Sequence, residues 1–81
     1  MKVEEIKNDI DASLKVGDKY EMVEEFLKKN HMLYDFDYHQ SRFQARPDSE
    51  EKDVRNIAIY IYTDIDRQFA KAHVERVYTG L

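Results

Sequence analysis

The first third of the chain has apolar residues at intervals of three and four. Val3, Ile6, Ile10 and Leu14 form one narrow stripe, with charged residues around it. This spacing matches the 3.6-residue turn of an α-helix that buries one side. The pattern predicts a helix over residues 2–14.

A second helical pattern follows after Gly17, a residue that readily takes a positive φ. Asp18 and Glu21 have the spacing of a capping box. An apolar stripe then continues through Tyr20, Val23, Phe26 and Leu27. We therefore predict a helix over residues 19–30 that forms an αα-hairpin with the first.

Beyond residue 31 the apolar period changes to two, which is typical of strands. Residues 33–38 alternate aromatic and polar side chains, and residues 42–46 alternate again before Pro47. We expect two strands joined through Gln40-Ser41 and ended by Pro47, which cannot donate to a ladder. The turn lacks Asn-Gly or Asp-Gly, so the sequence specifies neither the register nor the buried face of residues 33–38.

The last third predicts two more strands. Residues 56–63 carry isoleucines on one face and alanine or tyrosine on the other, as expected of a central strand. Residues 64–68 connect this strand to another over residues 69–79, with a bulge expected near Arg76. The charged segment 47–53 is expected to be the most mobile loop.

These elements predict a single α+β domain over residues 1–81. Its helical hairpin packs on a four-stranded antiparallel sheet in a two-layer sandwich, because the helix stripes and the isoleucine face cover each other. The other sheet face stays open.

Composition narrows the class of protein. The 81 residues contain no cysteine, which excludes disulfides, thiolate metal sites and a cysteine nucleophile. The net charge is −4 and no basic stripe is present, so we do not expect nucleic-acid binding. No apolar run reaches the length of about 20 residues that spans a bilayer. We therefore expect a soluble, cytoplasmic protein without a membrane partner.

Asp35, Asp37 and His39 alternate along the third predicted element and suggest a metal site. Alternate residues on a strand are about 6.5–7 Å apart, which is wide for ligands of one ion. The segment also lacks the glycine and the final glutamate of a calcium loop. We favour a solvated strand face, no cofactor and no catalytic residue. A small metal-dependent enzyme that uses this face is the less favoured alternative.

The ten aromatic residues point to partner binding instead, because tyrosine is favoured in interface cores. The open sheet face would carry Tyr60 and Tyr62, surrounded by Arg42, Arg55, Lys71 and His73. Tyr38 completes the predicted partner-binding set. The same face could hold a second copy in a homodimer. Alternatively, these tyrosines pack across strands and only stiffen the sheet.

The order of helices, strands and turns in this chain resembles that of a known family, and a few residues carry the resemblance. They are Gly17, Asp18, Val23, Phe26, Leu27, the strand 57–62, the turn 64–68 and the closing residues 74–77. This order is similar to the half-repeats of β-lactamase-inhibitor proteins and to the small outer-membrane-assembly lipoproteins. The resemblance implies a non-catalytic module that holds or inhibits another protein through its sheet face. An acidic mimic of nucleic acid is an alternative, suggested by the excess of acids in residues 35–53.

Overall fold

The computed structural model describes residues 2–49 and 56–77. Two helices, α1 (Lys2–Ser13) and α2 (Tyr20–Lys29), precede four strands. The strands are β1 (Met32–Asp37), β2 (Arg42–Pro47), β3 (Ile57–Thr63) and β4 (Phe69–Arg76). The predicted α+β fold is therefore confirmed. Most of the loop expected to be mobile, and the end of the strand expected to reach residue 79, lie outside the described residues.

The four strands form one antiparallel sheet in the order β1-β2-β3-β4, so β3 is an internal strand as predicted. The register that the sequence did not specify is set by a turn over residues 38–41, which pairs Asp37 with Arg42. Ser41 takes a φ of 52° there, and its carbonyl oxygen accepts bonds from the backbone and hydroxyl of Thr63. The turn is thus tied to the end of β3.

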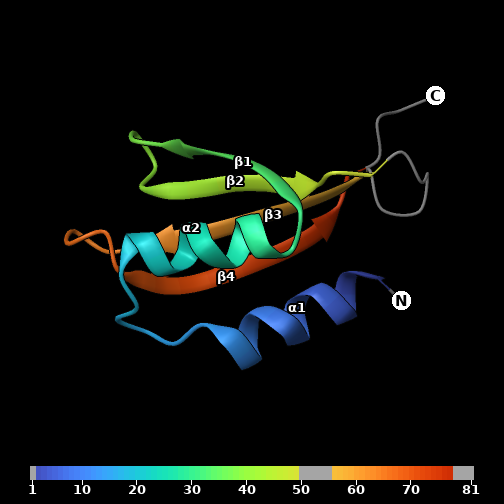
Figure 1. The fold of residues 1–81 in the computed structure, drawn as a ribbon. Coiled ribbons are helices and arrows are strands. Elements are labelled where there is room, and N and C mark those ends of the chain that lie inside the picture. Colours follow the sequence, from blue (N-terminus) through green and yellow to red (C-terminus); the bar gives the residue numbers. More distant parts are fainter. Residues whose placement is uncertain (1, 50–55, 78–81) are drawn as a thin grey trace.

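The helices cover one face of the sheet (Figure 1), with α1 against β4 and α2 against β1. They run in opposite directions, and each contacts a different margin of the sheet. Their apolar stripes meet the isoleucine face of β3 and form a single core. The core contains Ile10, Leu14, Val23, Phe26, Leu27, Phe43, Ala45, Ile57, Ile59, Ile61, Phe69 and Val74.

The orientation of β1 follows from this core. Tyr34 and Phe36 pack against it from the helix side, and the ring centroid of Phe36 lies 5.0 Å from that of Phe43. Asp35 therefore lies on the open side of the sheet, because successive side chains of a strand alternate between faces.

The predicted capping box at α2 is wrong. Lys19 is the N-cap residue, and no side chain caps this end of the helix. The Asp18 carboxylate instead accepts a bond from the backbone of Lys15 at 2.9 Å. The Asp18 carbonyl oxygen accepts from Phe69 at 2.7 Å, while Gly17, with a φ of 97°, donates to the Phe69 carbonyl. Tertiary hydrogen bonds to β4 thus place the helix start one residue later.

The predicted bulge near Arg76 is also wrong. Pairing between β3 and β4 is regular from Ile57–Arg76 to Tyr62–Lys71. The register shifts at the other end, where Thr63 pairs with Phe69 and Ala70 is the extra residue. This shift keeps Phe69 and Ala72 on the core side, since both pack in the core cluster.

Candidate functional site

The open face of the sheet carries five of the six residues predicted to bind a partner. Cross-strand pairing aligns Arg42, Tyr62 and Lys71 in one row. The next row aligns Gln44, Tyr60 and His73. The cluster therefore spans three strands, β2, β3 and β4. We call these six residues the tyrosine platform.

Arg42 organises the platform. Its guanidinium carbon lies 4.3 Å from the ring centroid of Tyr60 and 5.6 Å from that of Tyr62. One terminal nitrogen donates to the Tyr62 hydroxyl at 3.0 Å, and the other donates to Gln44 Oε1 at 3.1 Å. Planar guanidinium groups stack on aromatic faces while they donate in the plane. Arg42 thus holds both tyrosine rings in fixed positions.

The other basic side chains of the platform lie on β4. Lys71 Nζ is 5.1 Å from the ring centroid of Tyr62. The His73 ring stacks nearly parallel to Tyr60 at 6.5 Å, and its Nε2 is 3.8 Å from a Glu75 carboxylate oxygen. Within the described residues, Arg42 and Lys71 form no ion pair with a carboxylate. Their positive charge is therefore available to an acidic group of a partner.

Tyr38 is separated from the platform. It follows β1 and lies at the helix side, where its ring centroid is 5.1 Å from that of Phe36. The guanidinium carbon of Arg67, in the β3–β4 turn, lies 4.6 Å from the ring centroid of Tyr38. Arg55, which the sequence placed around the open face, lies outside the described residues.

Asp35, Asp37 and His39 do not lie along one strand as predicted, because β1 ends at Asp37 and His39 lies beyond it. Asp37 ends β1, and its carboxylate accepts bonds from the backbones of His39 and Gln40 at 2.9 and 3.2 Å. His39 lies in the turn that this carboxylate stabilises. Among the described residues, no group of three or more histidine or acidic side chains could hold a metal ion.

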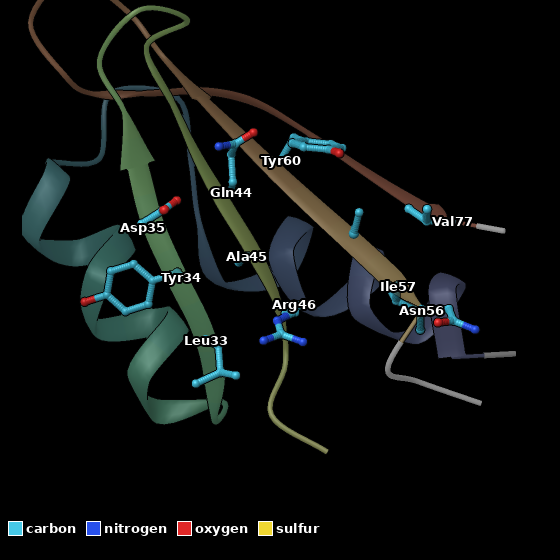
Figure 2. A pocket seen from close by; sticks show the side chains of 11 residues that line it. Leu33, Tyr34, Asp35, Gln44, Ala45, Arg46, Asn56, Ile57, Tyr60 and Val77 are labelled. Carbon is cyan, nitrogen blue, oxygen red and sulfur yellow. The ribbon is translucent and has the colours of Figure 1, made fainter. Parts of the chain in front are cut away.

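A shallow groove of about 550 Å³ adjoins the platform on the open face (Figure 2). Ala58 lines the groove with its small side chain, and so do Leu33 and Arg46, which are paired across β1 and β2. Tyr60 borders the groove, and Leu33 and Val77 add apolar rims that are 44% and 39% exposed. The groove has the size and lining to hold an aliphatic side chain.

This groove is not predicted by the sequence pattern. Its only local signal is the single alanine between large residues on the outer face of β3. Leu33, Arg46 and Val77 meet around Ala58 only through the pairing of the strands.

No helix in the described part of the chain is long and apolar enough to cross a membrane. Comparison of the chain with protein-family models, curated proteins and solved structures finds no match.

Proposed function

We propose that this protein is a non-catalytic module that binds, and by binding inhibits or recruits, another protein through its open sheet face. The observation that carries this proposal is the stacking of Arg42 on Tyr60 and Tyr62 beside a groove with apolar rims. Arginine and tyrosine are enriched among the residues that dominate binding energy. Rings already held in place lose little side-chain entropy when a partner docks.

The charges on this face favour a particular kind of contact. Arg42 and Lys71 flank Tyr62 on the two neighbouring strands. Asp37 is the β1 partner of Arg42, but neither cation forms an ion pair with a carboxylate of the described residues. An acidic side chain of the partner would pair with them, while an aliphatic side chain would enter the groove over Ala58. The resemblance to β-lactamase-inhibitor half-repeats supports the same kind of activity.

The proposal is tested by filling the groove. In Ala58→Leu, the larger side chain occupies the space that the partner would use, and Tyr60→Ala removes the wall beside it. Both variants should capture fewer specific proteins from the native cell by affinity purification and mass spectrometry. Each of the two substitutions is expected to weaken partner binding by about 2 kcal/mol or more, as at a central hot spot of an interface.

Tyr38→Ala is the matched control, because Tyr38 is 68% exposed but lies away from the platform. This variant should capture the same proteins as the unmodified chain. Circular dichroism and urea unfolding confirm that all variants fold. Equal capture by Ala58→Leu, Tyr60→Ala and the unmodified chain would show that the face only stiffens the sheet.

A further inference from the structure

Strand β1 presents an edge of the sheet. It pairs only with β2, and no described helix or strand lies beyond it in Figure 1. The Asp48 backbone N–H donates to the His31 carbonyl, so His31 and Asp48 form a hydrogen-bonded pair. Hydrogen-bonded and non-hydrogen-bonded pairs alternate along an antiparallel ladder. Leu33, Asp35 and Asp37 therefore bond toward β2, whereas the backbone groups of Met32, Tyr34 and Phe36 point outward. Outward-pointing groups of this kind are a template for another strand.

The opposite edge differs from β1. At the start of β4, the Phe69 backbone already bonds in both directions with Gly17 and Asp18. Helix α1 also packs along β4. By contrast, β1 contains no proline and no lysine, and its pairing with β2 has no bulge. These are the usual devices that block an exposed edge, so β1 is the edge open to addition.

The charges beside this edge are acidic on both sides of the sheet. On the open side, Asp35 is exposed and forms no hydrogen bond or ion pair with the described residues. On the helix side, Glu24 accepts a bond from the Tyr34 hydroxyl at 3.0 Å. A strand added here would place its own side chains opposite these carboxylates.

A second copy of the chain would bring acidic side chains together in some registers at this edge. Antiparallel pairing of two β1 strands must match the outward-pointing residues of each. The register centred on Asp35 places this aspartate directly opposite its copy. The register centred on Tyr34 leaves the two Asp35 side chains on a diagonal, and that centred on Phe36 sets Asp35 against Asp37. Like charges directly opposite each other across strands are destabilising, so the registers centred on Asp35 and on Phe36 are disfavoured.

We infer that β1 is a docking edge for an extended segment of a partner protein that carries lysine or arginine at alternate positions. The segment adds a fifth strand through the backbones of Met32, Tyr34 and Phe36, and its basic side chains pair with Asp35. Strand addition obtains affinity from main-chain bonds and specificity from alternate side chains. This inference rests on the proposed protein-binding function, because the added strand extends the same open face.

The test uses three synthetic peptides of about eight residues, a usual strand length. One alternates lysine with valine and threonine, the second has glutamate in place of lysine, and the third is the lysine peptide with N-methyl groups at alternate backbone positions. The lysine peptide should bind and slow amide hydrogen exchange at Tyr34 and Phe36 in NMR spectra. The glutamate and N-methylated peptides should not.

Charge reversal supplies the matched variants. Asp35→Lys should lower the affinity for the lysine peptide by about fivefold, because an attractive cross-strand pair becomes repulsive. The same substitution should raise the affinity for the glutamate peptide. Glu75→Lys makes the same change on the open face of β4 and should leave the affinity unchanged.

Three outcomes would overturn the inference. The N-methylated peptide could bind as well as the lysine peptide, or Asp35→Lys could have no more effect than Glu75→Lys. Protection of Tyr34 that grows with protein concentration, without any peptide, would make a second copy the occupant. Capture experiments with Ala58→Leu are independent of these readouts, so the docking edge can fail while the tyrosine platform stands.

Discussion

At the residue scale, the contact between Tyr34 and Glu24 couples the sheet to α2. The Tyr34 hydroxyl donates to Glu24 Oε2, and both side chains are half-buried. Burial, and next the bond to Glu24, raise the pKa of Tyr34 above its ordinary value of 10.0. Burial and the charge of Glu24 also raise the pKa of Tyr20. A single glutamate thus opposes the ionisation of two tyrosines.

This coupling predicts how stability depends on alkaline pH. Above pH 10.0 the unfolded chain loses tyrosine protons that the folded state still holds, so the free energy of unfolding falls as pH rises through the raised pKa values. Below pH 10.0 the contribution is fully present. Glu24→Gln should make the alkaline fall shallower, because a neutral acceptor does not repel tyrosinate.

Urea unfolding measured from neutral to alkaline pH checks this prediction. Glu25→Gln is the control, since Glu25 is exposed on the same helix and does not act on either tyrosine pKa. A Glu24→Gln profile that parallels the unmodified protein would contradict the proposed coupling.

At the scale of one element, the start of α2 has an unused capping position. Lys19 has the extended backbone of an N-cap, with φ −70° and ψ 156°, but its side chain has no oxygen to accept from the first turn. The carboxylate of Asp18, which could have capped the helix, instead accepts a hydrogen bond from the Lys15 backbone. The local preference for a capping box is therefore overridden by the loop between α1 and α2, which hydrogen-bonds to Phe69 of β4.

Introducing a capping side chain at this position should stabilise the protein. Lys19→Ser should unfold at higher urea concentration than Lys19→Ala, with a difference of about 1 kcal/mol in the free energy of unfolding. Both variants remove the same long side chain, so their difference isolates the cap. If the two variants are equally stable, the Lys19 assignment as N-cap is wrong.

At the scale of the whole molecule, stability rests on one core shared by both helices and the inner face of the sheet. Ile61 is completely buried at the centre of this core, whereas Ile65 in the β3–β4 turn is 96% exposed. The same substitution at the two sites therefore separates core packing from surface effects.

Ile61→Val should lower the free energy of unfolding by about 0.5–1.5 kcal/mol, through lost transfer energy and a small cavity. Ile65→Val should change it by less than about 0.5 kcal/mol. Chemical denaturation of both variants measures the two values. A comparable loss at Ile65 would mean that the turn is buried in a larger assembly.

The sequence by itself determined the order of the elements, the internal position of β3 and the isoleucine face of the core. These features follow from periods of 3.6 and two within single segments, where the side-chain direction is a local property. The same reasoning placed Arg42, Tyr60, Tyr62, Lys71 and His73 on one face, because alternation relates residues of a strand to its two faces.

Only the tertiary structure decided the register, the position of the bulge, the start of α2 and the separation of Tyr38 from the platform. It also decided which side of β1 is buried and brought Leu33, Arg46 and Val77 together around Ala58. These features depend on hydrogen bonds and packing between segments far apart in sequence, and the energy of such contacts is not encoded in the period of any one segment.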